Sequence, residues 1–315
     1  MLRVRARRGA PGGAVLSPPS RRAAVAGLVA INVVWAAGYP LAAIALREIP
    51  ASLLTLARLG VAAAMFAPFL RLPGGAPWGR RPALLAVGLG AVGFALPIYL
   101  QTAGLARSSA AMTAVLVALE PLLTAVLATA VAGQRLPAGR AAALAVALCG
   151  AWLIAGLPRP GHGGFLAGDA LLVVSVLCYA TYNALSATLT AEVPPLQAAA
   201  ATLWTGFLAM IPLWLLGGAP GPRRLTWGPA GAAAFLAVVG TGLAYVVWMT
   251  ALGSMPAAEA ALYLYLQPVC GVVLSAILLG ARPDAAFYAG AALVLCGVFL
   301  GSARGGPART PSRSA

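Results

Sequence analysis

The chain has 315 residues, of which 61% are hydrophobic and only 9% are charged. A soluble domain carries about a quarter of charged residues, so this composition excludes an ordinary soluble protein and indicates an integral membrane protein. The formal net charge of +15 comes from 21 basic residues, all arginine, set against six acids. The arginines lie in the tails and between apolar segments, not on one face of a soluble fold, so we expect no nucleic-acid partner.

Ten apolar segments are long enough to cross a bilayer as helices, which takes about 20 residues. We expect these helices at 23–46, 50–70, 82–105, 108–132, 138–157, 168–190, 195–216, 228–252, 256–280 and 284–302. The breaks between them are short and rich in glycine, proline and arginine, which leaves no room for a soluble domain. The basic tails, 1–22 and 303–315, are poor in apolar residues, so we predict that both are disordered.

The arginines of the first half are unevenly divided between alternate breaks. The N-terminal tail and the breaks at 71–81 and 133–140 carry most of them, whereas the other breaks carry only Arg47 and Arg107. Because basic loops stay in the cytoplasm and early helices usually set the orientation, we expect both termini in the cytoplasm and the protein in the plasma (inner) membrane. The second half shows the opposite bias.

The sequence repeats itself at an interval of about half its length. Two pairs superimpose, Glu120-Pro121 on Gln267-Pro268 at an offset of 147 and Trp35-Ala36 on Tyr179-Ala180 at an offset of 144. The chain is therefore two copies of one unit, at 23–157 and 168–302, each with five segments. An odd number of segments forces the second copy to enter the membrane upside down. We predict an all-α integral membrane protein of about ten transmembrane helices, arranged as two inverted five-helix repeats.

These halves and motifs resemble the drug/metabolite transporter superfamily, in its ten-helix EamA type. The resemblance is carried by residues 35–40, Arg58, the stretch LEPLLTAVLATAVAGQRL at 119–136, and the segments 168–185 and 266–283. It implies two EamA-like repeats, each with a late helix that carries a Glu-Pro motif. It also implies a secondary transporter of small metabolites or drugs, usually an exporter, in which two inverted halves alternately expose a central site.

The central site implied by the resemblance lies near Glu120-Pro121 and Gln267-Pro268. The family usually shows glutamate in both copies, but this chain has glutamine in the second. Only Glu120 can therefore supply a carboxylate from this pair of motifs. The substrate itself, and import against export, are not determined by the motifs.

Glu120 lies in the middle of an apolar segment, where a charge costs at least about 2.5 to 3.5 kcal/mol. We expect its side chain to face the bundle interior or a wet cavity, and because burial disfavours the charged form, Glu120 is a candidate for carrying protons. Pro121 lacks an N–H, which leaves the carbonyl of Val117 without its helical partner and favours a kink. Pro268 does the same in the second copy. Alternatively, Glu120 only donates one structural hydrogen bond between helices.

Two further groups are candidates for the substrate pathway. Arg58 lies about eight residues, or 12 Å, inside its helix, where it reaches Glu120 or an anionic substrate, or else extends to the membrane interface. Glu259, Tyr263 and Gln267 recur at i, i+4 and i+8, which places them on one stripe of the ninth helix. We assign this stripe to the cavity; the alternative is one acid near a loop and two packing residues.

Aromatic side chains at membrane depth complete the list of candidate pathway residues, which adds Trp35, Tyr39, Tyr182 and Tyr245. Some aromatic residues of such a protein belong to the interfacial belt or to the core. The expected partners are a small-molecule substrate, protons and membrane lipid. The protein is a monomer or a homodimer.

Several motifs are better explained by packing than by chemistry. GLGAVG at 88–93 fits a dinucleotide-binding pattern, but it lies inside an apolar segment and has no acid about 20 residues later. GVFLG at 297–301 is a small-residue pattern that pairs the last helix with a neighbour in the bundle or with a second protomer. The four cysteines have no metal-ligand spacing, and there is a single histidine.

We therefore expect no metal, no cofactor and no catalytic triad, and we predict that the protein is not an enzyme. The alternative, an intramembrane enzyme or a lipid-modifying protein, would need clusters of histidine and acid near a membrane face. No nucleotide-binding G-x-x-x-x-G-K-[ST] motif is present in the sequence either. Transport would then draw its energy from a coupled gradient or from the substrate's own gradient.

Overall fold

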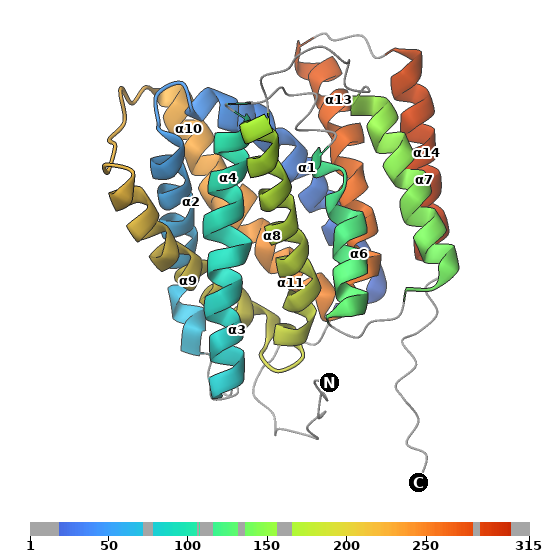
Figure 1. The fold of residues 1–315 in the computed structure, drawn as a ribbon, viewed down its shortest axis with the longest axis horizontal. Helices are drawn as coiled ribbons and strands as arrows, with labels where there is room; N and C mark the ends of the chain where they lie inside the picture. Colours follow the sequence, from blue (N-terminus) through green and yellow to red (C-terminus); the bar gives the residue numbers. More distant parts are fainter. Residues whose placement is uncertain are drawn as a thin grey trace.

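The computed structural model describes residues 19–71, 78–105, 107, 116–131, 136–155, 166–279 and 284–303. All secondary structure in these ranges is helical, and it follows the ten predicted segments (Figure 1). The helices of the first half are α1 (Arg21–Ala45), α2 with η1 (Ala51–Phe66 and Ala67–Arg71), α3, η2 and α4 (Arg80–Gly90, Ala91–Ala95 and Leu96–Leu105), α6 (Glu120–Ala130) and α7 (Ala138–Ala155). Those of the second half are α8 (Leu166–Thr190), α9 (Pro195–Leu216), α10, η3 and α11 (Trp227–Phe235, Leu236–Leu243 and Ala244–Leu252), α12, η4 and α13 (Ala257–Ala260, Ala261–Tyr265 and Leu266–Leu279) and α14 (Ala285–Ala303).

The described helices confirm the all-α, multi-span class. Six of them are long and apolar enough to cross a membrane, and three more are shorter apolar helices. Residues 1–18 and 304–315 of the predicted tails, and the first part of the predicted fourth segment, 108–115, lie outside the described residues. The prediction of disorder is wrong for Arg21, Arg22 and Ala303, which belong to α1 and α14. Large apolar side chains remain exposed on the outside of the bundle, among them Leu84, Val87, Val174, Leu208 and Phe299. Such exposure is expected where lipid, and not water, surrounds the helices.

The two halves are inverted relative to each other. Figure 1 shows α1 beginning and α14 ending at the lower edge of the molecule, whereas α8 begins at the upper edge. We call the lower edge the terminal face and the upper edge the far face. Side-chain contacts agree: Arg81 pairs with Glu192 at 2.9 Å on the terminal face, and the Glu48 carboxylate accepts a hydrogen bond of 2.7 Å from the Thr226 N–H on the far face. The inverted repeat is thus confirmed.

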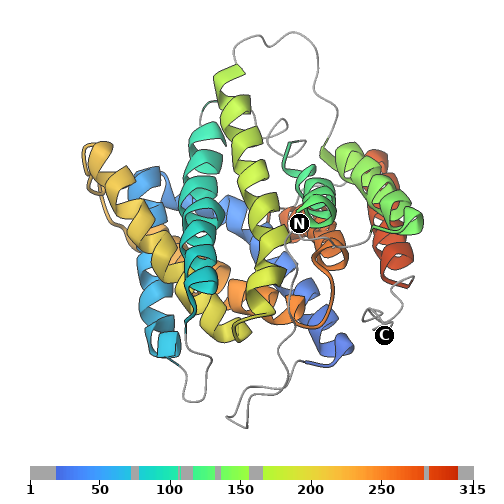
Figure 2. The same cartoon turned by 60° about the horizontal axis from the view of Figure 1, so that its bottom comes forward.

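The last helix packs inside the bundle, as one of the two interpretations of GVFLG predicts. Figures 1 and 2 show α14 side by side with α7. Gly150 of α7 and Gly290 of α14 meet so closely that a Cβ on Gly150 would lie 2.5 Å from the Gly290 carbonyl oxygen. Gly297 lies equally close to α7, since its Cβ would be 2.7 Å from the Ala143 carbonyl oxygen. Small residues here allow the two backbones to touch.

Two of the three glycines of GLGAVG, Gly90 and Gly93, serve helix packing. A Cβ on Gly90 would overlap Thr205 of α9, and one on Gly93 would overlap the ring of Tyr182 in α8. The last three residues of the motif, 91–93, belong to the π-helical turn η2, and the third span of the second copy has a π-helical turn at the same place, η3. A π-turn widens the helix and changes which backbone carbonyls face a neighbour, and such turns often occur at functional sites.

Candidate functional site

A cavity of about 120 Å³ lies between the two halves. Its lining includes five of the residues predicted from the sequence, which are Trp35, Arg58, Glu120, Tyr245 and Gln267. As the inverted repeat predicts, Glu120 of the first copy and Gln267 of the second line the same cavity. Both repeats therefore contribute to one central site.

Glu120 begins α6, immediately after an interruption of the helix. Residues 116–117 are helical, 118–119 form a turn, and the helix restarts at Glu120. Pro121 is buried in the first turn of α6, where a missing N–H costs no helical hydrogen bond. The break turns the Glu120 side chain into the cavity, where its Oε1 accepts a hydrogen bond of 3.0 Å from the side-chain amide of Asn183 in α8.

The second copy is broken at the same point by a different geometry. Residues Ala261–Tyr265 form the 3-10 helix η4, and α13 restarts at Leu266, so that Pro268 lies in its first turn. The predicted distortion before each proline is thus present in both copies. Gln267 lines the cavity beside Leu264, the residue whose carbonyl the proline leaves without a helical partner.

Arg58 and Trp35 both bond to the π-helical turn η3. The Arg58 Nε donates to the Thr241 hydroxyl at 3.2 Å, and the Trp35 indole N–H donates to the Gly240 carbonyl at 3.0 Å. These contacts hold the guanidinium at the cavity wall and exclude the alternative that it extends to the membrane interface. Within the described part of the chain, no carboxylate forms a salt bridge with Arg58, so its positive charge is available to the cavity.

Five aromatic rings form one cluster along the cavity. Tyr245 packs against Trp35 at 5.4 Å and against Phe94 at 4.5 Å between ring centroids. Tyr182 lies 5.8 Å from Tyr245 and is fully buried, so it supports the wall without lining the cavity. Trp248 stands behind Trp35 at 6.1 Å. The cluster joins rings from both repeats, which gives the site a rigid apolar side.

Of the predicted stripe of Glu259, Tyr263 and Gln267, only Gln267 lines this cavity. The segment Ala261–Tyr265 is 3-10 and not α-helical, and at three residues per turn the positions i, i+4 and i+8 no longer share a face. Tyr263 is buried, with 4% of its surface exposed. Glu259 is turned toward the terminal face instead.

Of the remaining predicted residues, Tyr39 has a side chain that lies outside the described part of the structure. Four further polar residues also line the cavity, namely Gln101, Thr102, Tyr179 and Asn183. Tyr179 was recognisable in the sequence, because the repeat places it on Trp35. Asn183 lies one helical turn further along the same helix face.

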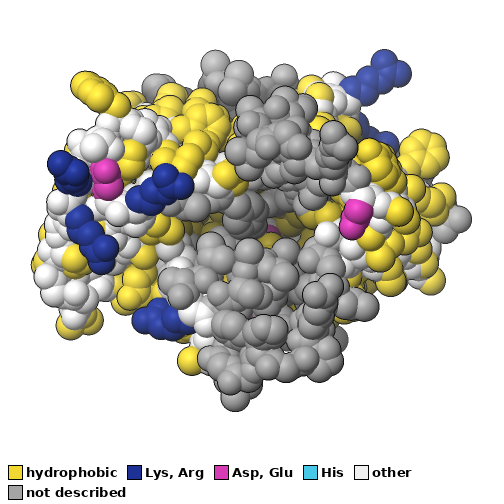
Figure 3. All heavy atoms as spheres, turned by 90° about the horizontal axis from the view of Figure 1, so that it is seen from above, with side chains coloured by type: hydrophobic (Ala, Val, Ile, Leu, Met, Phe, Trp, Pro, Cys, Tyr) yellow, Lys and Arg dark blue, Asp and Glu magenta, His cyan; other side chains and the backbone are white. Residues whose placement is uncertain are grey.

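The cavity extends toward the far face. Its lining includes Leu46, just past the end of α1, and Gln101 and Thr102 near the end of α4. Toward the terminal face, every residue from 257 to 266 is buried. Figure 3 looks onto the far face, where the described surface on both sides carries arginines and acids among apolar side chains. The structure is thus closed on the terminal side of Glu120.

Comparison with known proteins places this geometry in a family. The model of the EamA-like transporter family matches residues 22–156 and 166–303. A probable terminal-alkyne amino-acid exporter of Streptantibioticus cattleyicolor is 27% identical over 284 residues, covering 88% of this chain and 92% of that protein. An uncharacterized transporter of Archaeoglobus fulgidus is 23% identical over 248 residues, covering 77% of this chain and 85% of that protein.

A solved crystal structure has the same fold. It superimposes with a TM-score of 0.73 at 19% sequence identity, over 90% of this chain and 96% of its own. Identity at this level supports the fold alone. The family model, in contrast, matches both halves of the chain separately, each over the five-helix unit found here. The chain belongs to the EamA-like transporter family of the drug/metabolite transporter superfamily, and it is a membrane transporter and not an enzyme.

Proposed function

We propose that the protein is a secondary transporter that exports small zwitterionic metabolites of the amino-acid type. The observation that carries this proposal is the pair of opposite charges, Arg58 and Glu120, on the wall of one central cavity. A substrate carboxylate would pair with the Arg58 guanidinium, which binds carboxylates well because of its forked donors. A substrate ammonium would pair with the Glu120 carboxylate.

The size and lining of the cavity favour a small substrate. Its volume of about 120 Å³ is well below the roughly 300 to 1,000 Å³ of sites for drug-sized ligands. Trp35, Leu236 and Leu264 offer apolar surface for a side chain. The relative from Streptantibioticus cattleyicolor, whose name describes an amino-acid exporter, supports the same class.

We infer the orientation from the arginines. The terminal face carries Arg21, Arg22, Arg71, Arg80, Arg81 and Arg140, and the far face carries Arg47, Arg107, Arg223 and Arg224. The excess on the terminal face supports a cytoplasmic position for that face and for the ends of α1 and α14 that lie there. The cavity then opens to the outside of the cell membrane, which is the state from which an exporter releases its substrate.

Coupling would follow from competition at Glu120. Its carboxylate can hold either a proton or the substrate ammonium, but not both, because a protonated carboxyl has no charge to pair with. A proton that enters from outside would displace the substrate outward, and the next substrate would displace the proton inward. Gln267 cannot take part in this exchange. The coupling would therefore be an antiport through a single acid.

The test is flux in liposomes that contain the purified protein. We expect an imposed pH gradient to drive neutral amino acids, whereas their amides, which lack the carboxylate, and their N-acetyl forms, which lack the ammonium, are not moved. Both derivatives keep the side chain, so each isolates one charged contact. Equal flux of an amino acid and its amide would contradict the proposed role of Arg58, and flux that ignores the pH gradient would contradict antiport.

A further inference from the structure

We propose that Arg21, Arg140 and Glu259 form an ionic lock that closes the terminal face and opens once in each transport cycle. The inference rests on the proposed function only in assuming that the two faces open alternately. It assigns a role to Glu259, which does not line the cavity, and to two arginines that the sequence marks only as topology signals.

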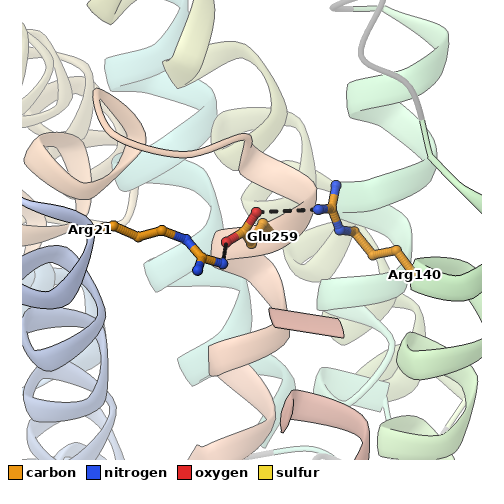
Figure 4. Close-up of polar contacts among 3 residues, drawn as sticks. All are labelled: Arg21, Arg140 and Glu259. Carbon is orange, nitrogen blue, oxygen red and sulfur yellow. Dashed lines mark hydrogen bonds and ion pairs between the residues drawn. The ribbon is translucent and has the colours of Figure 1, made fainter. Parts of the chain in front are cut away.

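The three side chains come from three different spans (Figure 4). Glu259 projects from α12 between the start of α1 and the start of α7. Its Oε1 lies 2.7 Å from Arg21 Nη2, and its Oε2 lies 3.2 Å from Arg140 Nη2. Each carboxylate oxygen holds one guanidinium, and the two arginines approach from opposite sides. Glu259 thus links a helix of the second repeat to two helices of the first.

Burial of Glu259 and Arg140 distinguishes their contact from an ordinary surface ion pair, whereas the side chain of Arg21 is 51% exposed. The side chains of Glu259 and Arg140 are only 4% and 9% exposed. On the same face, the Arg81–Glu192 pair is 42% and 28% exposed, so water screens it. A buried charge that loses its partner is strongly destabilised, whereas a surface pair contributes little. The contacts of Glu259 therefore favour the closed face, and those of Glu192 do not.

The lock lies on the direct path from the cavity to the terminal face. Between Glu259 and the cavity residue Leu264 lie only buried residues, with Ala261 and Leu262 completely inaccessible. A substrate that reaches the cavity from the terminal face must pass this segment. When the segment moves, water reaches Glu259 and Arg140 and solvates their charges, which makes separation of the pairs reversible. One shift of α12 releases both arginines together.

The repeat does not supply a second lock. At the offset of 147, the position of Glu259 corresponds to Met112 in the first copy, and that of Arg140 corresponds to Phe287 in the second. The lock is thus a feature of one face. It stabilises the arrangement seen here, in which the terminal face is closed and the cavity extends toward the far face.

The experiment measures access to the terminal face directly. In a variant whose four cysteines, Cys149, Cys178, Cys270 and Cys296, are replaced by serine, Ala261→Cys places one thiol between the lock and the cavity. A membrane-impermeant maleimide is applied to the terminal face in vesicles of known orientation. We expect Glu259→Gln to raise the labelling rate about tenfold, which corresponds to about 1.4 kcal/mol, because both pairs are lost while size is kept.

The matched control is Glu192→Gln, which removes the exposed pair on the same face and should leave labelling unchanged. Arg140→Lys keeps the charge and should label close to the parent rate, whereas Arg140→Gln should label faster. If Glu259→Gln fails to fold, the Arg140 pair of variants decides the outcome. Labelling that is the same in Glu259→Gln or Arg140→Gln as in the parent would overturn the lock.

Labelling needs neither substrate nor gradient, so the ionic lock and the proposed amino-acid export can be contradicted independently. Faster labelling of Glu259→Gln together with no flux of any amino acid would retain the lock and reject the substrate class. Unchanged labelling together with normal amino-acid flux would reject the lock and retain the transporter. Maleimide applied to the far face gives the internal check, since opening of the terminal face should slow labelling of a thiol introduced at Gln101.

Discussion

The fourth and ninth spans are two copies of one helix that meet in the cavity. In α6 the residue before the proline is Glu120, which accepts a hydrogen bond from Asn183, and before the proline of α13 it is Gln267. Both copies have the helix break, but only one has an ionisable group. The comparison teaches that the break shapes the site and that the charge, if it couples transport to protons, acts from one side alone.

The largest expected effect comes from making the two copies alike. Glu120→Gln should abolish pH-driven flux, at least about a hundredfold loss, because glutamine can neither take up a proton nor form the charge-assisted hydrogen bond to the substrate ammonium, which is worth roughly 1.5 to 3 kcal/mol. Glutamine keeps the size, so the fold should persist. Flux in liposomes at matched protein amounts is the measurement. Equal flux in the variant would reduce Glu120 to a structural hydrogen bond.

Moving the acid to the other copy sharpens this result. In the double variant Glu120→Gln with Gln267→Glu, the cavity again holds one carboxylate, but now on α13. The position that corresponds to Asn183 in the first copy is Tyr39 at the offset of 144, so the amide that supports Glu120 is missing there. We expect the double variant to stay inactive. Restored pH-driven flux would show that the cavity needs one acid and that its side is unimportant.

Arg58 gives the second-largest expected effect, and it too breaks the symmetry of the repeat. Its counterpart at the offset of 144 is Thr202, a buried residue. Arg58→Gln should weaken amino-acid binding by about 10- to 100-fold, the value of one hydrogen-bonded charge. Arg58→Lys keeps the charge but loses the forked donors of the guanidinium, so its affinity for the amino acid should lie between those of the parent and of Arg58→Gln. Calorimetric titration measures this, and the amino-acid amide should bind parent and variant equally weakly.

Removing the support of Glu120 should have a smaller effect. Asn183→Leu keeps the shape of the side chain but removes the N–H that donates to Glu120 at 3.0 Å. One hydrogen bond to a charged acceptor is worth roughly 1.5 to 3 kcal/mol, and water in the cavity can replace part of it, so we expect about a tenfold loss of flux. Asn183→Asp, which places a second acid beside Glu120, should lose more. Full activity of Asn183→Leu would mean that Glu120 needs no partner.

The sequence predicts the symmetric part of the molecule better than the asymmetric part. Hydropathy locates the ten segments because it can be read within each segment alone. Self-comparison predicts that Glu120 and Gln267 share one cavity because it matches pairs of positions in the sequence. The 3-10 helix at Ala261–Tyr265 has no comparable sequence signal, since the same residues are equally compatible with an α-helix. The sequence therefore groups Glu259 with Gln267, whereas in the structure Glu259 contacts Arg21 and Arg140. Its true partners are 238 and 119 residues away, and only the tertiary packing brings them together.

The smallest expected effects come from two tyrosines that the sequence treats alike and the structure separates. Tyr245 lines the cavity, while Tyr263 lies in the closed segment toward the terminal face. Tyr245→Phe removes a hydroxyl from the cavity wall and keeps the ring in contact with Trp35 and Phe94. One net hydrogen bond contributes about 0.5 to 1.5 kcal/mol, so substrate binding should weaken by a factor of about two to ten.

Tyr263→Phe is the matched control, since it makes the same chemical change in η4, the 3-10 helix that directly precedes the helix of Gln267. Because Tyr263 does not line the cavity, its substitution should leave the substrate Kd within about twofold of the parent, below the factor expected from losing one hydrogen bond at the site. Its effect, if any, should appear in the rate at which the terminal face opens. If Tyr263→Phe changed the Kd as much as Tyr245→Phe does, Tyr263 would contact the substrate. The prediction that Glu259, Tyr263 and Gln267 share one surface would then hold in the state that binds substrate.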